Sequence, residues 1–392
     1  MTANATCLGC GCACDDIEVV TRDSRIVEAK NACELGLRWF GDGTVPSRSR
    51  VAGRDVSLDE AVRAAAQLLK NASRPLVYLA PDLACEAQRE TVGVADALGA
   101  ALDSVTSATA MPSILAAQER GRASATLGEI RRRADIVVLW SVDPTLNYPR
   151  YLSRYAPEAE GRTIIRVHIA AADEVATLTA LTAIVSGRVK ENVGVGPAWD
   201  LARGLAPRLL AARYVAIVAD GEPDEAQPED PGRAGALISF AQALNGPTRA
   251  ALSLLRAGGN RAGADAVMTW QTGYPAAVDF TQGHPRYQPH DGTATARLNR
   301  GDVDALLVVG AAALIPAALL TSMARVPRVV IGPRASERAL DGADVAIDTG
   351  VAGIHDGGTA FRMDDVPLPL RPALTGPPSA ADVVGALRKA MR

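Results

Sequence analysis

The chain has 392 residues, which is long for one hydrophobic core, so about two or three domains are expected. Its 41 Lys and Arg residues nearly balance its 44 Asp and Glu residues, giving a net charge of −3. This balance, without a basic run interleaved with aromatics, argues against a nucleic-acid partner. The longest apolar run, residues 304–316, is too short for a membrane span and is broken by Gly310 and Pro316. These features predict a cytoplasmic protein without nucleic-acid or membrane partners.

The chain begins with a cysteine cluster that has the spacing of a metal site. Four of its cysteines follow the pattern C-x2-C-x3-C-x18-C, namely Cys7, Cys10, Cys14 and Cys33. Such spacing lets a tight loop direct four thiolates to one iron-sulfur cluster, although four cysteines can also bind zinc. Disulfides are disfavoured because residues 1–6 lack the features of a secretory signal. The spacing therefore predicts a metal site, with an iron-sulfur cluster ahead of zinc and Cys12 as a spare.

Strand and helix patterns alternate along the rest of the chain. Residues 16–30 contain two β-rich runs around a polar turn, which predicts a hairpin. Ser57-Leu-Asp-Glu60 is a capping-box signature followed by helical periodicity to Lys70. Further strands are expected at 75–80, 102–105, 136–140, 163–168, 214–219, 305–309 and 328–331. Further helices are expected at 84–98, where Cys85 is simply a core residue, and at 112–119, 174–186, 199–206, 231–244 and 316–324. The alternation predicts parallel sheets covered by helices on both faces.

Three segments have less regular patterns. Residues 258–289 are expected to form a structured loop of the kind used in binding or at a domain interface. The Gly-rich residues 353–364 resemble a loop whose backbone N–H groups can approach a phosphate, which is a weak signal by itself. The acidic, proline-containing residues 220–231 are expected to be a solvated surface loop.

Motifs distributed over nearly the whole chain carry a family resemblance. They are the N-terminal cysteine block through Val19, residues 126–129, 133–140 and 270–280, the pairs Pro149-Arg150 and Arg154-Tyr155, and residues 285–287 and 357–364. Together they resemble the B subunit of formylmethanofuran dehydrogenase, in the molybdopterin/tungstopterin oxidoreductase superfamily. The block 270–280, Trp-Gln-Thr-Gly-Tyr-Pro-Ala-Ala-Val-Asp-Phe, is the most specific match.

The resemblance implies an α/β fold and a redox chemistry. The fold would consist of three-layer αβα domains of the molybdopterin-oxidoreductase type, with a small N-terminal cysteine-bearing domain. The expected bounds are 1–50 for the cysteine domain, 51–130 and 300–392 for the two parts of one αβα domain, and 131–299 for an inserted αβα domain. In the dehydrogenases of that family, the B subunit holds a [4Fe-4S] cluster and a metal bound by two pterin dinucleotides, and it interconverts carbon dioxide and formate.

One peptide departs from the family where the metal would be bound. A Cys-His-Gly-Pro-Ser peptide supplies the metal's thiolate or selenolate ligand and a proton-transferring histidine in the family. The matching residues here are Thr109-Ala110-Met111-Pro112-Ser113, which lack both groups. Asp143 stands where the family prefers Asn and would repel a pyrophosphate, and Gly310-Ala311-Ala312 lacks the usual Asp-Pro. We therefore expect no catalytic residue at Thr109 or Ala110, and no molybdopterin or tungstopterin.

This pattern is closest to the B subunit of the formyltransferase/hydrolase complex of methylotrophic bacteria. In that complex, the D subunit moves a formyl group from formyltetrahydromethanopterin to a methanofuran-type carrier, and the amidohydrolase-like A subunit hydrolyses the product to formate. We expect a non-catalytic structural subunit of such a hetero-oligomer, with the A, C and D subunits as partners. The alternative is an active pterin-dependent dehydrogenase subunit with an unusual metal ligand. A third class is a binding module whose emptied cavity accepts the carrier's tail.

The resemblance also divides the candidate site residues into two groups. Cys7, Cys10, Cys14 and Cys33 are the candidate [4Fe-4S] ligands. Whether they hold a cluster stays open, because free cysteines also pack as small apolar residues. The relics of a pterin site would be Asp143, Arg286, Gly358, Thr359, Arg362 and Asp364. The charged residues at 286, 362 and 364 can equally be members of fold-stabilising ion pairs.

Overall fold

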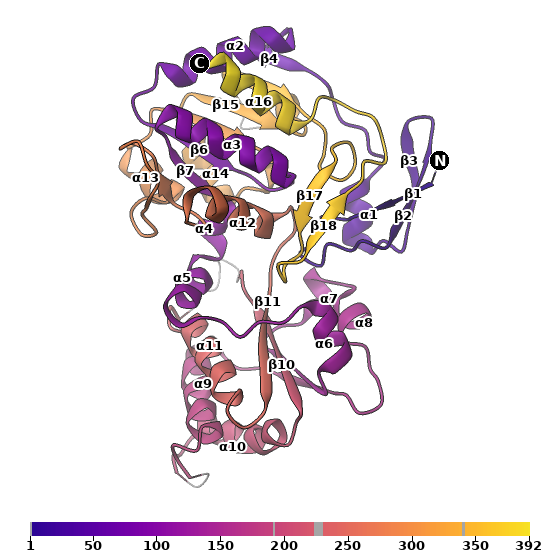
Figure 1. Ribbon diagram of the computed structural model, residues 1–392, viewed down its shortest axis with the longest axis vertical. Helices are drawn as coiled ribbons and strands as arrows, with labels where there is room; N and C mark the ends of the chain where they lie inside the picture. Colours follow the sequence, from indigo (N-terminus) through magenta and orange to yellow (C-terminus); the bar gives the residue numbers. More distant parts are fainter. Residues whose placement is uncertain (1, 191–192, 223–229, 339–341) are drawn as a thin grey trace. The chain divides into compact units, whose positions relative to one another are not determined.

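The computed structural model describes residues 2–190, 193–222, 230–338 and 342–392, and they form a mixed α/β fold. The chain divides into two compact units (Figure 1). The first unit consists of Met1–Ala108 together with Ala257–Arg392, and the second unit is Thr109–Arg256. No helix in the described parts of the chain is long and apolar enough to cross a membrane.

A nine-stranded sheet organises the first unit, in the order β13-β12-β7-β6-β14-β15-β16-β4-β5. Its parallel central strands are β7 (Ala101–Ser104), β6 (Pro75–Leu79), β14 (Ala305–Val309), β15 (Arg328–Gly332) and β16 (Val345–Asp348). Its antiparallel edges are β12 (Val278–Asp279) with β13 (Arg286–Tyr287), and β4 (Ser49–Val51) with β5 (Arg54–Val56). Every residue of the central strands is buried, as expected for parallel strands covered on both faces.

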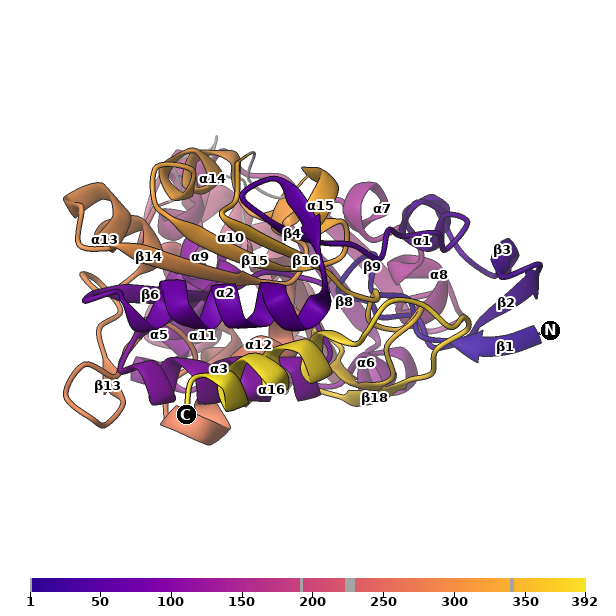
Figure 2. The ribbon, with the colours of Figure 1, turned by 90° about the horizontal axis from the view of Figure 1, so that it is seen from above.

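Helices cover both faces of this sheet (Figure 2). One face packs against α2 (Leu58–Lys70), α3 (Cys85–Leu98), α12 (Arg261–Thr272) and α16 (Ala380–Ala390). The other packs against α13 (Ala294–Arg300), α14 (Ala317–Met323) and α15 (Ala335–Arg338), near the short 3-10 helix η1 (Ala312–Leu314). The Ser57 hydroxyl accepts the Glu60 N–H at the start of α2, so the predicted cap is confirmed.

The N-terminal segment forms a small sheet of its own within the first unit. Its strands are β1 (Thr2–Ala5), β2 (Ile17–Arg22) and β3 (Arg25–Lys30), followed by α1 (Glu34–Phe40). The C-terminal hairpin of β17 (Gly358–Phe361) and β18 (Pro367–Leu370) packs beside it. Leu8 and Ala13 share one apolar cluster with Ala360, Leu368 and Leu370. The cysteine segment therefore takes part of its core from residues more than 300 positions along the chain.

The second unit contains a four-stranded parallel sheet in the order β11-β10-β8-β9. The strands are β8 (Ile136–Trp140), β9 (Thr163–Val167), β10 (Tyr214–Asp220) and β11 (Arg249–Leu255). One face packs against α5 (Met111–Arg120), α9 (Ala171–Val185), α10 (Pro197–Leu210) and α11 (Arg233–Leu244). The remaining helices are α4 (Val105–Thr109), which crosses the unit boundary, and α6 (Leu127–Arg133), α7 (Pro144–Asn147) and α8 (Tyr151–Tyr155).

Most predicted elements are present, but the expectation of an irregular segment at 258–289 is wrong in its first half. Helix α12 occupies Arg261–Thr272 and packs on α3. It buries Ala262, Gly263, Ala264, Val267, Met268 and Thr272, and the glycines at 258, 259, 263 and 273 obscured this helix in the sequence. Strand β11 and helix α16 were not predicted. Of the predicted acidic loop, residues 223–229 lie outside the described part of the chain.

The bounds of the second unit differ from the expected insertion at 131–299. Residues after 257 join the first unit because β12 pairs with β7, and because the Asp103 carboxylate accepts N–H groups of Ala277 (3.1 Å) and Ala294 (2.6 Å). Residues 109–130 join the second unit because α5 packs on α11 and the Ala123 carbonyl accepts the Leu252 N–H. These long-range contacts leave no local signal in the sequence.

Candidate functional site

The four candidate ligands gather around one loop of the first unit, residues 7–14, which we call the cysteine loop. The Cys7 N–H donates to the Cys14 carbonyl at 2.9 Å and the Ala13 N–H to the Cys10 carbonyl at 3.1 Å, closing the loop on itself. Cys7 and Cys14 are each 7% exposed, whereas Cys10 is more exposed. Cys33 is the N-cap residue of α1, which begins directly after it.

Electrostatics link these thiols to one another. Burial raises the pKa of the Cys7 thiol, the Gly9 N–H at 3.4 Å from its sulfur opposes this, and Cys10, Cys14 and Cys33 raise it further. The Cys7 thiol is therefore within electrostatic reach of the other three candidate ligands. Burial raises the pKa of the Cys85 thiol in α3 to about 11, which suits a core residue.

The geometry of the cysteine side chains bears on which metal group they could hold. Among the described residues, no group of three or more His, Cys, Asp or Glu side chains is arranged to hold one metal ion. Ligands of a [4Fe-4S] cube bind its four corners and stand further apart than ligands of one zinc ion. This chain offers such a cluster four thiols around a closed loop and one N–H donated to a sulfur.

The Thr109–Ala110 peptide lies in the second unit and starts a helix. Thr109 is the last residue of α4, and Ala110 is the buried N-cap residue of α5, with its carbonyl accepting the Ile114 N–H at 3.1 Å. Ala110 has no group that can titrate, and a threonine hydroxyl is a poor substitute for a soft thiolate ligand. The peptide therefore starts α5 through its backbone, and positions 109 and 110 carry neither a thiol nor an imidazole.

Asp143, also in the second unit, is an exposed carboxylate at the end of β8. It accepts the Thr145 hydroxyl at 2.7 Å and the Thr145 N–H at 2.9 Å, capping α7. These bonds, and to a lesser extent the charges of Arg166 and His168, lower the pKa of Asp143. The group is therefore anionic at neutral pH and would repel a phosphate.

In the first unit, the charged relic candidates form internal ion pairs. The Arg362 guanidinium binds the Asp364 carboxylate through two bonds of 2.6 and 2.8 Å, and the two side chains are 11% and 3% exposed. Arg286 lies 3.4 Å from the buried Asp279, which also binds Arg297 at 2.5 Å. Each guanidinium thus has a carboxylate partner within its own unit.

The Gly358-Thr359 donors face a carboxylate from the same unit. Glu86 of α3 accepts the Thr359 N–H at 2.9 Å and the Thr359 hydroxyl at 3.1 Å. A Cβ at Gly358 would lie 2.2 Å from the Glu86 Oε2 atom. An anionic group would have to displace Glu86, so the relic candidates do not fit a pterin dinucleotide.

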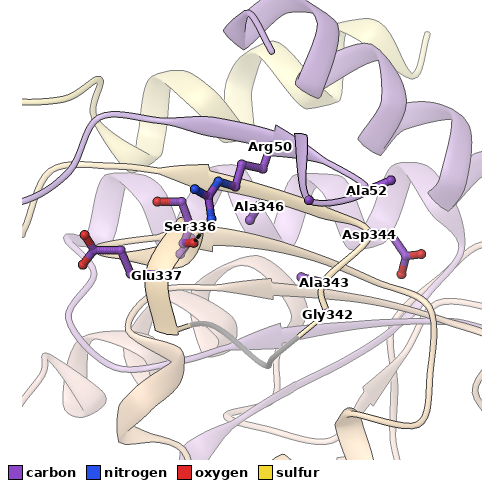
Figure 3. A pocket seen from close by; sticks show the side chains of 10 residues that line it. Arg50, Ala52, Ser336, Glu337, Gly342, Ala343, Asp344 and Ala346 are labelled. Carbon is purple, nitrogen blue, oxygen red and sulfur yellow. Dashed lines mark hydrogen bonds between the residues drawn. The ribbon is translucent and has the colours of Figure 1, made fainter. Parts of the chain in front are cut away.

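A separate cleft of about 440 Å³ lies beside β4 and α15 in the first unit (Figure 3). Arg50 on its wall donates to the Ser336 carbonyl at 2.9 Å and pairs with Asp55 at 2.7 Å. The other lining residues are Ala52, Gly53, Ala335, Glu337, Gly342, Ala343, Asp344 and Ala346. None of the predicted site residues lines this cleft, and its guanidinium is already paired.

Sequence reasoning missed one buried carboxyl group close to the cysteine loop. Asp82 follows β6 after Ala80 and Pro81, and its N–H donates to the Gly259 carbonyl at 2.9 Å. Burial raises the pKa of Asp82 to about 6, while Trp39 and Arg261 oppose the shift. Its position just after a central parallel strand was the available signal, since such positions line the carboxyl edge of a sheet.

Comparisons with known proteins place this geometry in context, although no family model matches the chain. The chain is 31% identical to the B subunit of tungsten-containing formylmethanofuran dehydrogenase 2 from Methanocaldococcus jannaschii, covering 95% of this chain and 94% of that protein. It is 28% identical to the B subunit of the formyltransferase/hydrolase complex Fhc from Methylorubrum extorquens, covering 80% and 87%. One protein chain of the FhcABCD crystal structure from that bacterium, in complex with methylofuran, matches with a TM-score of 0.72 and 25% identity, covering 88% and 98%.

Proposed function

Because the chain belongs to the family of the formylmethanofuran dehydrogenase B subunit, we propose that it is a non-catalytic structural subunit of a formyltransferase/hydrolase complex. Such a complex converts formyltetrahydromethanopterin to formate through a formylmethanofuran-type carrier. The observation that carries this proposal is the Thr109–Ala110 peptide, which supplies a helix start in place of a metal ligand and a proton carrier. Neither formyl transfer nor hydrolysis needs the electrons that a metal-pterin centre would handle.

The proposal extends to the assembly. The partners would be an amidohydrolase-like A subunit, the C subunit and the formyltransferase D subunit, in a cytoplasmic hetero-oligomer. The likeness to one protein of the four-subunit FhcABCD structure supports this arrangement. The helix-covered sheets of the two units support αβα domains of the molybdopterin-oxidoreductase type.

We further propose that Cys7, Cys10, Cys14 and Cys33 hold a [4Fe-4S] cluster. When bound, such a cluster accepts and donates single electrons. In a protein without a metal-pterin partner, its remaining role would be to tie the N-terminal segment together, because that segment has a small core. The four cysteines and the Gly9 N–H are what this chain contributes to the site.

An active dehydrogenase subunit is the second candidate. It is favoured by the 31% identity to the tungsten-containing relative, against 28% for the Fhc relative, and by the four cysteines. This candidate requires a metal-pterin centre without the soft ligand, since Thr109 and Ala110 occupy the family's positions.

Elemental analysis of the complex, purified without oxygen, separates the two candidates. The structural role predicts no tungsten or molybdenum, with about four irons per chain if the cluster is bound. Tungsten or molybdenum near one atom per chain would overturn the structural proposal. Iron absent together with tungsten and molybdenum would remove the cluster and leave the structural role.

Activity assays supply a second, independent test. The complex should release formate from formyltetrahydromethanopterin when the furan carrier is present, and it should not reduce a viologen dye with formate. Thr109→Val should leave formate release unchanged with the complex assembled. Formate-dependent dye reduction that Thr109→Val abolishes would instead establish the dehydrogenase.

A further inference from the structure

Two backbone hydrogen bonds from distant segments hold the cysteine loop. The Gly259 N–H donates to the Leu8 carbonyl at 2.9 Å, and the Met363 N–H donates to the Gly11 carbonyl at 3.0 Å. The loop has neither helix nor strand between residues 7 and 14. Since its backbone has no ladder of its own, these outside donors help to decide where its sulfur atoms point.

Met363 lies in the turn between β17 and β18, and a buried ion pair spans it. The Arg362 N–H donates to the Val366 carbonyl at 3.0 Å, and the Asp365 N–H donates to the Arg362 carbonyl at 2.9 Å. The Arg362 guanidinium donates two hydrogen bonds, of 2.6 and 2.8 Å, to the Asp364 carboxylate. Because these two residues flank Met363 directly, their pairing fixes the direction of its N–H group.

The β17–β18 hairpin also contributes the apolar side chains on which the cysteine loop packs. Leu8 and Ala13, each 2% exposed, pack in one cluster with Ala360, Leu368 and Leu370. The Thr6 hydroxyl, just before the loop, donates to the Pro369 carbonyl at 2.9 Å. The hairpin thus contacts the loop through both backbone and side chains, and the ion pair lies at the end that reaches Gly11.

We propose that Arg362 and Asp364 are positioning residues that hold the cysteine loop in the shape that presents its thiols to a metal. That the loop's shape serves metal binding rests on the proposed cluster. The ion pair holds the loop in this shape in the metal-free chain as well. Asp364→Asn or Arg362→Lys weakens the charged two-bond contact across the turn, so the turn can rearrange and release Gly11. The pair then serves the cysteine site without touching a ligand.

The test measures thiol reactivity in the full-length chain, reduced and stripped of metal with a chelator. N-ethylmaleimide is added in short pulses, and mass spectrometry reports the modification of each cysteine. Asp364→Asn should accelerate modification of Cys7 and Cys14 by about tenfold or more, because a lost charged hydrogen bond raises the open population of the loop by that order. Arg362→Lys, which keeps the charge but loses the two-bond grip, should give a smaller increase.

Internal and external controls separate this role from general destabilisation. Cys85, buried in α3, should keep its wild-type rate in both variants. Arg297→Gln breaks a similarly buried pair with Asp279, with side chains 13% and 5% exposed, and should leave Cys7 and Cys14 protected. Wild-type rates for Cys7 and Cys14 in Asp364→Asn would overturn the proposal, as would a parallel acceleration of Cys85.

Iron content distinguishes this inference from the proposed cluster. If the wild-type chain holds iron, Asp364→Asn should lower the iron per chain and Arg297→Gln should not. Full iron in Asp364→Asn would count against the positioning role. An iron-free wild-type chain removes the cluster, while the reactivity of Cys7 and Cys14 still decides whether the hairpin holds the loop.

Discussion

The cysteine loop and residues 109–113 are the two segments where the family's redox groups would bind. They differ in how many packing and backbone contacts their residues make with the rest of the fold. In the loop, Leu8, Cys12 and Ala13 are buried at 2% exposure or less, and the loop contacts residues 259 and 363 through its backbone. By contrast, Ala110 starts α5 through its carbonyl, a role that almost any residue can fill.

This difference explains how a chain can have cysteines in one place and lack the metal ligand in the other. Cys7 and Cys14 are small apolar residues in a packed core, so their replacement costs stability whether or not a metal is bound. A ligand side chain at 109 would contribute only its chemistry. The presence of cysteines is therefore weaker support for redox function than the absence of the soft ligand is against it.

The largest expected effect comes from Gly258→Ala, because the added methyl group would clash with the backbone of the cysteine loop and displace the loop. An added Cβ would lie 2.1 Å from the Leu8 carbonyl oxygen and 2.7 Å from the Cys10 nitrogen. We expect the free energy of unfolding of the first unit to fall by about 3 kcal/mol or more, measured by urea unfolding with circular dichroism. Gly204→Ala in α10, where a Cβ meets nothing within 4 Å, should be neutral or stabilising. Similar losses in both variants would show that the loop contact is unimportant.

A second change tests whether the second unit has stability of its own. Glu174 Oε1 accepts the Trp140 indole N–H at 2.6 Å and the Arg233 Nε–H at 2.9 Å, and the paired side chains are 6% and 7% exposed. Glu174→Gln removes the carboxylate charge from beside the buried Arg233 guanidinium and should cost about 2–3 kcal/mol in urea unfolding. The cysteine alkylation rates should not change.

Asp200→Asn is the matched control, because it removes the exposed partner of Arg203 in the same unit. It should cost about 0.5 kcal/mol or less. If Glu174→Gln also made Cys7 and Cys14 react faster, the stability of the second unit would be coupled to that of the cysteine loop. This result would contradict the independence of the two regions.

The third prediction concerns pH and the buried carboxyl group near the loop. Burial raises the pKa of Asp82 from 3.8 to about 6, so the folded chain keeps this proton after the unfolded chain has lost it. Stability from this group is therefore complete below pH 3.8 and is lost as the pH rises to about 6. The loss should be roughly 3 kcal/mol, and Asp82→Asn should remove it from the pH profile of urea unfolding.

Asp356 is a second carboxyl group against which the pH profile of Asp82→Asn can be compared. Burial also raises the pKa of Asp356 to about 6, so a slope of the same sign should remain in that variant. Asp356→Asn should remove its own part, while burial also raises the pKa values of Asp103 and Asp220 and leaves a slope of the same sign. A wild-type profile that rises over this pH range would contradict the assignment of both groups.

The smallest effect is expected at the former ligand peptide. Thr109→Val changes a half-buried side chain that the proposed function does not use, and Ala110→Ser places its hydroxyl at the N-cap position of α5, where it can accept one of the first helix N–H groups. Each should alter the free energy of unfolding by about 0.5 kcal/mol or less. Cys7→Ser is the contrasting change, because it places a hydroxyl in the buried loop and should cost more than either. If the Cys7→Ser variant were as stable as wild type, the packing explanation for the cysteines would be removed.

Local patterns were sufficient for much of the fold. The Ser57 capping box, the apolar run 136–140 and the hairpin at 16–30 depend on neighbours within a few residues, and each was predicted close to its observed bounds. The family resemblance, carried by motifs such as 270–280, was also readable from sequence. The helix that enters that same block was missed, because glycines lie within and beside it and its buried face is completed by packing on α3 and β17.

The sequence by itself determined which chemical groups this protein has: four cysteines in ligand spacing, and threonine and alanine where a soft ligand and a histidine would be needed. Only the tertiary structure decided what those groups contact. The pairing of Arg362 with Asp364, the Glu86 carboxylate on Thr359 and the Met363 bond to Gly11 join residues without a local pattern, or join them across hundreds of positions. Such contacts arise from packing of whole elements, and no short-range period in the chain records them.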